Sequence, residues 1–341
     1  MKKHILNFTD KPFIIAEMSA NHNQSLERAL KIVEAAANSG AHAIKLQTYT
    51  ADTMTIKGAF TITDENSLWK GRELHQLYEE AYTPWDWHKP IFEKAKSLGL
   101  IAFSTPFDET AVDFLETLDV PIYKIASFEN TDWPLLKKVA QTKKPVIMST
   151  GSAKLSEIDD AVRILRENGC EQLTLLKCTS TYPSSPENTN LKTIPHLKEL
   201  FNCNVGLSDH TLGIGVAVAS VSLGATVIEK HFTLSRLDGG VDSAFSIEPE
   251  ELKNLVIETE RAFLALGTIQ YGVQVSEEKS LMYKRSIYVS KDIKEGELFS
   301  KENIRVIRPG LGLSSKYFEI IIGKKAVKNF KSGTPLTWEN I

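Results

Sequence analysis

The sequence predicts an α/β fold, a (β/α)8 TIM barrel, followed by a small, mainly β domain at the C-terminal end. Three observations support this fold. Short apolar runs recur between residues 13 and 231, most of them stop at a charged or hydroxyl side chain, and segments of helical periodicity separate most of the runs. Strands that are buried on both faces read as continuous apolar runs, and barrel enzymes carry their catalytic groups at the C-terminal strand ends.

Eight strands are predicted, and polar residues follow each of them. They are Phe13–Ile15 before Glu17, Ala43–Ile44 before Lys45 and Gln47, Ile101–Phe103 before Ser104 and Thr105, Ile122–Tyr123 before Lys124 and Ser127, Val146–Met148 before Ser149 and Thr150, Leu173–Leu176 before Lys177 and Thr179, Val205–Leu207 before Ser208, Asp209 and His210, and Val227–Ile228 before Glu229, Lys230 and His231.

The intervals between the runs predict amphipathic helices. Apolar residues from Leu26 to Ala36 follow helical spacing and end at Gly40, which is a stop signal. One interval is longer, because residues 50 to 100 hold three tryptophans and a helical stretch over Glu73–Tyr82. Long insertions after a barrel strand lie on the catalytic face, so we expect a lid or a specificity loop here.

The chain of 341 residues is longer than one barrel of about 250 residues. We predict a catalytic barrel over residues 1–270, a linker over 271–283 and a compact β domain over 284–341. Two β-like runs, Ser286–Val289 and Ile304–Ile307, are separated by glycine turns. A domain of about sixty residues is near the lower limit for folding alone, so it is expected to lean on the barrel or on a second subunit.

Composition excludes several classes of protein. A net charge of -3, with basic residues dispersed along the chain, argues against nucleic-acid binding. The uncharged run Gly213 to Ile228 is too short for a membrane span and predicts a buried helix leading into the last strand. Asn7, Thr9 and Asp10 interrupt any apolar core after Lys2 and Lys3, which argues against export. The three cysteines have no metal or redox spacing, so a cytoplasmic location is expected.

The first candidate site consists of His210 and His231, which follow consecutive predicted strands. Adjacent strand ends lie close enough for two imidazoles to share one divalent metal ion, with positions left for water and substrate. No third side-chain ligand is evident, although Glu17 or Asp242 is a candidate, directly or through water. The alternative is that each histidine is a hydrogen-bonded or surface residue.

The second candidate site contains Lys45 and Lys124, with hydroxyls from serines at neighbouring strand ends. A lysine at the end of an interior strand has to place its ammonium in the barrel mouth, because an unpaired buried charge is costly. An anionic substrate with phosphate and carboxylate groups is a natural partner. Two alternatives stay open, namely a salt bridge to Glu17 or Glu229 and a Schiff-base lysine of an aldolase. The serines are Ser127, Ser149 and Ser208.

A series of motifs, in this order along the chain, resembles the sialic acid synthase family. The motifs are Ile15-Ala16-Glu17-Met18-Ser19-Ala20-Asn21-His22, Lys45-Leu46-Gln47-Thr48, Ser104-Thr105-Pro106-Phe107, Tyr123-Lys124-Ile125-Ala126-Ser127, Ser149-Thr150-Gly151, Cys178-Thr179-Ser180-Thr181-Tyr182-Pro183, Gly206-Leu207-Ser208-Asp209-His210 and Glu229-Lys230-His231-Phe232. The tail, with Lys291 to Gly296 and Arg308-Pro309-Gly310, resembles that family's antifreeze-like (SAF) domain. The resemblance covers essentially the whole chain.

The resemblance implies a metal-dependent condensation of phosphoenolpyruvate with the open-chain aldehyde of an N-acyl amino sugar, which releases phosphate. These two small molecules are the expected partners, and a domain-swapped homodimer is implied because Arg308 matches the residue that reaches a neighbouring subunit's site. Glu17 is the candidate for accepting the proton of the attacking water. By the same resemblance, His210 and His231 match ligands of Mn²⁺ or Mg²⁺, Lys45, Thr105, Lys124, Ser127, Ser149 and Ser208 match phosphoenolpyruvate contacts, and Gln47, Ser180, Tyr182 and Asp242 fall at the sugar.

Departures from the family pattern favour the branch that makes pseudaminic acid from a 2,4-diacetamido-2,4,6-trideoxy hexose (6-deoxy-AltdiNAc). Met18-Ser19-Ala20 and Ser180 replace residues that are usual in neuraminate synthases, and the long insertion carries Leu68-Trp69 and Trp87-His88. Gln24 stands where the family often has glycine. The neuraminate and legionaminate branches are the alternatives within the family. A non-catalytic sugar-binding barrel is the alternative of another class, and loss of the lysine or histidine set would be its signature.

Overall fold

The computed structural model describes residues 11–65 and 69–341. Lys2, Lys3, Asn7, Thr9 and Asp10, which entered the argument against export, and Leu68 of the insertion lie outside the described residues. The chain divides after Gly267 into two compact units. Within the described residues, no helix is long and apolar enough to cross a membrane.

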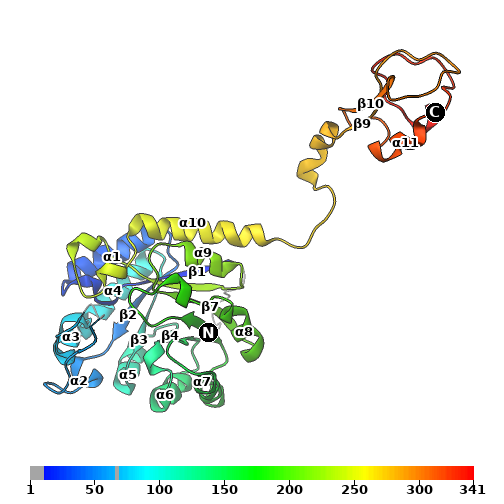
Figure 1. The fold of residues 1–341 in the computed structure, drawn as a ribbon. Helices are drawn as coiled ribbons and strands as arrows, with labels where there is room; N and C mark the ends of the chain where they lie inside the picture. Colours follow the sequence, from blue (N-terminus) through cyan, green and yellow to red (C-terminus); the bar gives the residue numbers. More distant parts are fainter. Residues whose placement is uncertain (1–10, 66–68) are drawn as a thin grey trace. The chain divides into compact units, whose positions relative to one another are not determined.

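The first unit is a closed barrel of eight parallel strands, each hydrogen-bonded to the next, with the last strand paired to the first (Figure 1). Every predicted apolar run forms a strand, so the (β/α)8 prediction is confirmed. The strands are β1 (Phe13–Glu17), β2 (Ala43–Thr48), β3 (Ile101–Pro106), β4 (Tyr123–Ile125), β5 (Val146–Ser149), β6 (Leu173–Cys178), β7 (Asn204–Asp209) and β8 (Val227–His231).

Helices between the strands surround the barrel. Their starts follow ordinary capping rules: the Ser25 side chain accepts from the amide of Arg28 at 3.2 Å, and Asp132 accepts from that of Leu135 at 3.1 Å. The helices are α1 (Leu26–Asn38), α2 (Ala51–Met54), α3 (Leu74–Ala81), α4 (Trp85–Ser97), α5 (Glu109–Thr117), α6 (Trp133–Gln141), α7 (Leu155–Glu167), α8 (Thr193–Phe201), α9 (Gly215–Val221) and α10 (Pro249–Leu266).

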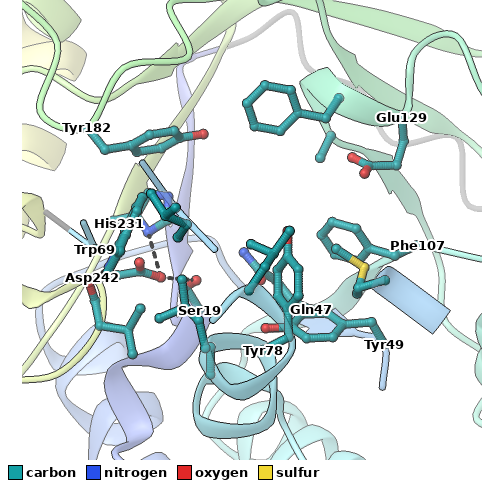
Figure 2. A pocket seen from close by; sticks show the side chains of 18 residues that line it. Ser19, Gln47, Tyr49, Trp69, Tyr78, Phe107, Glu129, Tyr182, His231 and Asp242 are labelled. Atoms are coloured by element: carbon teal, nitrogen blue, oxygen red, sulfur yellow. Dashed lines mark hydrogen bonds and ion pairs between the residues drawn. The ribbon is translucent and has the colours of Figure 1, made fainter. Parts of the chain in front are cut away.

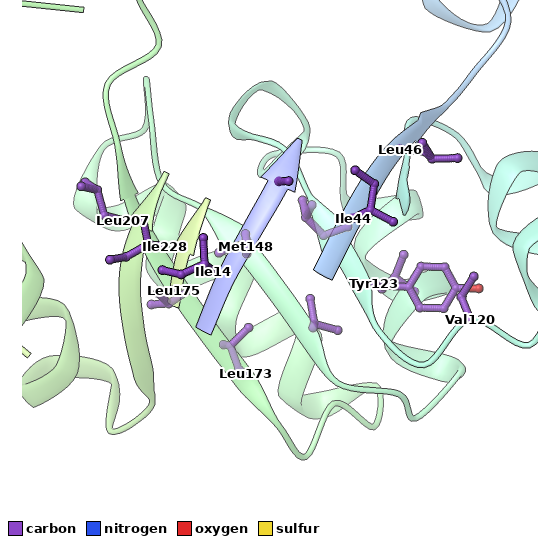
Figure 3. Close-up of a cluster of buried hydrophobic side chains, with 14 of the residues drawn as sticks. Ile14, Ile44, Leu46, Val120, Tyr123, Met148, Leu173, Leu175, Leu207 and Ile228 are labelled. Carbon is purple, nitrogen blue, oxygen red and sulfur yellow. The ribbon is translucent and has the colours of Figure 1, made fainter. Parts of the chain in front are cut away.

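Apolar side chains cover both faces of the barrel strands. Outward-facing residues such as Ile14, Ile44 and Leu207 join the main core under the helices (Figure 3). The alternate residues Ile15, Phe103 and Ile147 form a second buried cluster. Because both faces are occupied at this level, the polar residues that end the strands are left to line the barrel mouth.

The long interval between β2 and β3 holds α2, α3 and α4, and Leu74–Ala81 coincides with the helix predicted over Glu73–Tyr82. Hydrogen bonds from Gln24 connect this segment to the loop after β1. Its backbone adopts φ of 53°, the left-handed region in which glycine is favoured. Its side-chain amide donates to the backbone carbonyls of Glu80 and Tyr82, both at 2.9 Å. The glutamine therefore occupies the turn and adds two bonds that a glycine lacks.

The second unit has its own small core and a short antiparallel sheet. Strands β9 (Ser286–Val289) and β10 (Ile304–Ile307) form the two predicted β runs, followed by α11 (Phe318–Ile321). Ile287, Phe299 and Phe330 are among its fully buried residues. A 3-10 helix, η6 (Val275–Tyr283), lies within the segment expected to be the linker.

Candidate active site

The C-terminal ends of the barrel strands enclose a polar cavity, which we call the inner cavity. Each strand from β1 to β8 contributes to it directly or through the loop that follows. Its lining residues are Glu17, Lys45, Gln47, Thr105, Phe107, Lys124, Ala126, Ser127, Ser149, Cys178, Tyr182, Ser208, His210, Glu229 and His231. Most of the residues predicted to bind the metal and the anion therefore meet in one place.

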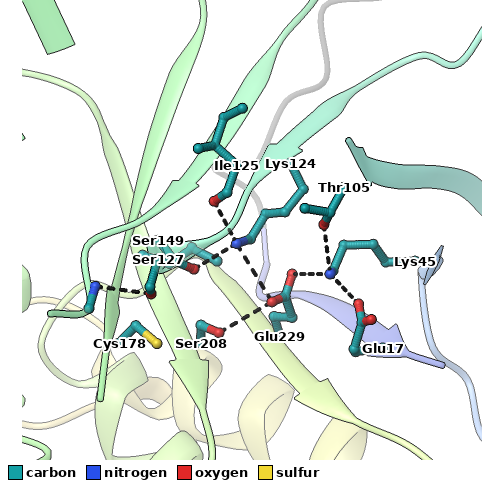
Figure 4. A network of polar contacts seen from close by, with 12 residues as sticks. Glu17, Lys45, Thr105, Lys124, Ile125, Ser127, Ser149, Cys178, Ser208 and Glu229 are labelled. Atoms are coloured by element: carbon teal, nitrogen blue, oxygen red, sulfur yellow. Dashed lines mark hydrogen bonds and ion pairs between the residues drawn. The ribbon is translucent and has the colours of Figure 1, made fainter. Parts of the chain in front are cut away.

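Two lysines and two glutamates form a buried network at the floor of this cavity (Figure 4). The Lys45 ammonium pairs with Glu17, lies 3.9 Å from Glu229 and donates to Thr105 Oγ1 at 3.0 Å. The Lys124 ammonium lies 3.8 Å from Glu229 Oε1. The salt bridges considered for the lysines thus exist, and they neutralise two cations that face an open cavity.

The network separates the pKa values of its two carboxylates. Burial raises the pKa of Glu17 to about 7, although Lys45 opposes the shift. Burial also acts to raise the pKa of Glu229, but attraction to Lys124 and Lys45 outweighs it, and the net pKa is lowered. Carboxylates whose pKa values are pushed apart in one site are suited to different roles in proton transfer. Glu17 is the one that exchanges a proton near neutral pH.

The lysines respond differently to the same surroundings. Burial acts to lower the pKa of Lys45, but Glu17 and Glu229 outweigh it and raise that pKa. For Lys124, burial prevails and its pKa is lowered. An arriving anion would raise the pKa of Lys124 again, because opposite charges favour ionisation.

Hydroxyl and amide donors complete the anion-binding side of the cavity. Lys124 Nζ donates to Ser149 Oγ at 2.7 Å, and the Gly151 amide donates to Ser127 Oγ at 3.1 Å. A side chain at Gly151 would clash, since an added Cβ would lie 2.2 Å from Ser180 Oγ and 2.6 Å from Ser127 Oγ. Gly151, which follows β5, therefore packs closely against a serine that follows β4 and another that follows β6.

The two histidines face one another beside the lysine network. The ring centroids of His210 and His231 are 5.3 Å apart. His210 Nδ1 lies 2.9 Å from the carbonyl of Thr179, which places a hydrogen on Nδ1. Burial acts to lower the pKa of His210, but the contacts with Cys178 and with the Thr179 carbonyl outweigh it and raise that pKa. Burial and the neighbouring positive charges hold the pKa of His231 well below its usual range, and its buried Nδ1 has no hydrogen-bond partner. A divalent ion binds the neutral form of an imidazole, which His231 already favours and which His210 reaches when it loses a proton.

A buried ion pair is formed by the residues next to the two histidines in the chain. Lys230 Nζ donates to Asp209 Oδ2 at 2.8 Å and to the Thr211 carbonyl at 2.6 Å, and both side chains are 1% exposed. Each partner is the chain neighbour of one histidine, so the pair fixes the ends of β7 and β8 relative to each other. Neither residue had a predicted role.

A second cavity of about 330 Å³ adjoins the first, and we call it the outer cavity (Figure 2). It is more apolar, and the insertion after β2 supplies much of its wall. Ser19 donates to the Asp242 carboxylate within it, and Trp69 donates to the Val241 carbonyl at 3.2 Å. It is lined by Ser19, Gln47, Tyr49, Met54, Ile62, Trp69, Leu74, Leu77, Tyr78, Ala81, Phe107, Ala126, Phe128, Glu129, Tyr182, His231, Val241 and Asp242.

The predicted sugar contacts divide between these places. Gln47 and Tyr182 line both cavities, and Asp242 lines the outer one. Ser180 lines neither cavity, and its Oγ lies 3.9 Å from Sγ of Cys178, which lines the inner one. Arg308 belongs to the second unit, where it is exposed after β10. Among the described residues, no group of three or more His, Cys, Asp or Glu side chains converges as a metal site, so a metal would rely on the two histidines, water and substrate.

Two acidic residues were missing from the predicted site. Glu229 was considered only as a salt-bridge partner, although its place at the end of β8 gives the same signal as Lys45 at the end of β2. Glu129 follows β4 in the loop after Ser127, and burial raises its pKa to about 7. Its Oε2 is buried without a hydrogen-bond partner. No spacing rule marks a residue in such a loop.

Comparison with known proteins gives the family. Residues 32–271 match the model of the NeuB family, and residues 284–341 match that of the SAF domain. The chain belongs to the NeuB family. This confirms the predicted resemblance and makes the chain a member of a family of enzymes.

Several NeuB-family relatives match over almost the full chain. The sequence is 46% identical to a pseudaminic acid synthase of Campylobacter jejuni over 97% of this chain and 96% of that protein. It is 40% identical to an N,N'-diacetyllegionaminic acid synthase of the same organism, over 94% of this chain and 97% of that protein. The crystal structure of an N-acetylneuraminic acid synthetase from Leptospira borgpetersenii, in complex with citrate, matches with a TM-score of 0.72 and 34% identity, covering 80% of this chain and 91% of that one.

Proposed function

We propose that this NeuB-family enzyme is a pseudaminic acid synthase. It condenses phosphoenolpyruvate with 6-deoxy-AltdiNAc and releases phosphate. The observation that carries the proposal is the junction of two unlike cavities, one basic and hydroxyl-lined, the other largely apolar. The higher identity to a pseudaminic acid synthase than to a legionaminic acid synthase supports this branch.

Phosphoenolpyruvate binds in the inner cavity. Lys45 and Lys124 exchange their contacts with Glu17 and Glu229 for the anion, while Thr105, Ser127, Ser149 and Ser208 donate hydrogen bonds to its oxygens. Donors that are already in place need little reorganisation as charge moves toward the phosphate. The lysines act through charge, with no Schiff base.

His210 and His231 would hold a divalent ion, Mn²⁺ or Mg²⁺. Their facing rings, and the buried unpartnered Nδ1 of His231, fit such an ion. When bound, the ion acts as a Lewis acid toward the sugar aldehyde and toward water. Asp209 and Lys230 keep the two strand ends in register, and Asp242, whose Oδ2 lies 3.9 Å from His231 Nδ1, is available through water.

Glu17 accepts the proton of the water that adds to the substrate. Its pKa of about 7 suits a general base, because a base works best when its pKa is near the operating pH. The Ser19 amide, which donates to Glu17 Oε1 at 3.1 Å, orients the carboxylate.

The sugar lies in the outer cavity, held by Gln47, Ser180, Tyr182 and Asp242. Among the described residues that line this cavity none is a lysine or an arginine. We therefore assign Arg308 of a second subunit to the sugar, in a domain-swapped homodimer whose parts are the barrel (1–270), the linker (271–283) and the SAF domain (284–341). All three cysteines are free, which agrees with a cytoplasmic enzyme.

The direct test is phosphate release from phosphoenolpyruvate with different sugars in the presence of Mn²⁺. The diacetamido sugar 6-deoxy-AltdiNAc should be used with the highest kcat/KM, ahead of the legionaminic acid precursor and of N-acetylmannosamine. Preference for either of the other two sugars would instead assign the chain to the legionaminate or neuraminate branch. No phosphate release with any sugar would favour the non-catalytic barrel.

A further inference from the structure

Part of the lining of the outer cavity is formed by apolar side chains that come from a single stretch of chain. Met54 ends α2, Ile62 lies in the loop before α3, and Leu74 and Leu77 belong to α3. We call these four residues the apolar wall. Leu77 is buried, whereas the other three are half-buried and present part of their surface to the cavity.

The polar lining residues lie mainly on other elements. Ser19 follows β1, Gln47 lies on β2, and Asp242 follows β8. In Figure 2 Asp242, Ser19 and His231 group together, apart from the cluster of Tyr49, Tyr78 and Phe107. Tyr49 packs edge-on against both of these rings, with centroids 5.7 Å from Tyr78 and 5.1 Å from Phe107. Gln47 and Glu129 also line the cavity, so its polar groups are not confined to one side, but the four side chains of the apolar wall carry no hydroxyl, amide or carboxylate group.

The direction in which the sugar lies follows from the residues that the two cavities share. Gln47, Phe107, Ala126, Tyr182 and His231 line both, so the cavities are continuous. The aldehyde carbon has to meet the three-carbon substrate of the inner cavity, which places C1 of the sugar at this junction. The opposite end of the sugar, C6, therefore extends into the outer cavity. This step rests on the proposed function.

We propose that the apolar wall is a specificity site for the deoxygenated C6 end of the sugar. A methyl group at C6 gains from contact with Met54, Ile62 and Leu74 by leaving water. A hydroxyl at C6 would lose water there without a hydrogen-bond partner from the wall, and an unpaired buried hydroxyl is unfavourable. The wall therefore selects 6-deoxy sugars over 6-hydroxy sugars of the same stereochemistry.

The test compares two substrates that differ by one oxygen atom, 6-deoxy-AltdiNAc and its 6-hydroxy analogue. An apolar pocket discriminates against an added hydroxyl by on the order of 10²-fold in kcat/KM. The near-isosteric changes Leu74→Asn and Met54→Gln each add a polar group to the wall. We expect each to lower the 6-deoxy to 6-hydroxy ratio about tenfold, and to leave the KM for phosphoenolpyruvate unchanged.

Ile56→Asn is the matched control, because Ile56 belongs to the same segment but is 70% exposed and does not line the cavity. It should keep the wild-type ratio. Equal use of both sugars by the wild-type enzyme would overturn the wall's role while leaving the proposed function intact, and so would an unchanged ratio in both variants. Use of N-acetylmannosamine alone would overturn the proposed function itself. If one variant does not fold, the substrate ratio of the other variant still tests the proposal.

Discussion

The inner and outer cavities share five lining residues but differ in origin and chemistry. Apart from Phe107, Tyr182 and a few other loop residues, the inner cavity is built from side chains at strand ends, and ion pairs hold several of them. The outer cavity takes most of its apolar surface from the segment inserted after β2. Under the proposed function, the groups that bind phosphoenolpyruvate thus sit mainly at strand ends, whereas the apolar wall sits on an added segment. Because of this separation, the sugar-binding segment can change while the strand ends stay the same.

The largest expected effect comes from the histidines of the inner cavity. His210→Ala and His231→Ala should each lower kcat by roughly 10³-fold or more, because the charge stabilisation of a bound cation is worth several kcal/mol. Mn²⁺ titration by calorimetry should show loss of binding in both variants. Circular dichroism checks that the barrel stays folded. Chelated wild-type enzyme should lose activity and recover it with Mn²⁺, and activity that survives chelation would contradict the metal assignment.

The next effect concerns the general base. Glu17→Gln should lower kcat by about 10²- to 10⁴-fold, the usual contribution of general base catalysis. Glu17 has to be ionised to accept a proton, so in the wild type kcat/KM should fall as pH drops below about 7, the raised pKa of this carboxyl. Stopped assays across pH 5 to 9 measure this limb, about tenfold per unit. An identical acid limb in Glu17→Gln would assign it to another group, with Glu129 the first to test.

A smaller effect is expected at the anion site. Lys124→Met removes one charge-assisted contact and should weaken phosphoenolpyruvate binding by about 1.5–3 kcal/mol, measured by calorimetry. Lys177→Met is the matched control, because Lys177 also lies near a strand end but lines neither cavity. Borohydride with substrate should trap no adduct on the wild-type enzyme. A covalent adduct at Lys45 or Lys124 would favour the aldolase alternative.

The smallest effect concerns closure of the outer cavity. Arg308→Ala should raise the KM for the sugar about tenfold or more, since a charge-assisted hydrogen bond contributes at least about 1.5 kcal/mol. Mixing this variant with His210→Ala tests whether the arginine comes from the partner. In a swapped dimer, equal mixing makes half of the dimers heterodimers, and each heterodimer has one complete site out of two. A quarter of all sites are then complete, so about a quarter of wild-type activity is expected. Mixed subunits that exchange but regain nothing would place Arg308 outside the partner's site.

Local sequence determined much of the inner cavity. Strand ends converge in any (β/α)8 barrel, so Lys45, Lys124, His210 and His231 are assembled by the fold's own symmetry. The two β runs of the second unit and the helix in the insertion also follow from period and turn signals alone. The family motifs, rather than the strand pattern, indicated which reaction takes place in this cavity.

Only the tertiary structure decided which groups pair and which face the sugar. The pKa values of Glu17 and Glu229 separate because the two carboxylates share buried lysines unequally, and no spacing in the sequence encodes that distance. Gln24 fits a left-handed turn because its amide reaches two carbonyls more than fifty residues away. Met54, Ile62 and Leu74 read as ordinary core residues in the sequence. They line a cavity because α2 and α3 pack beside the barrel mouth, a long-range contact that local periodicity does not specify.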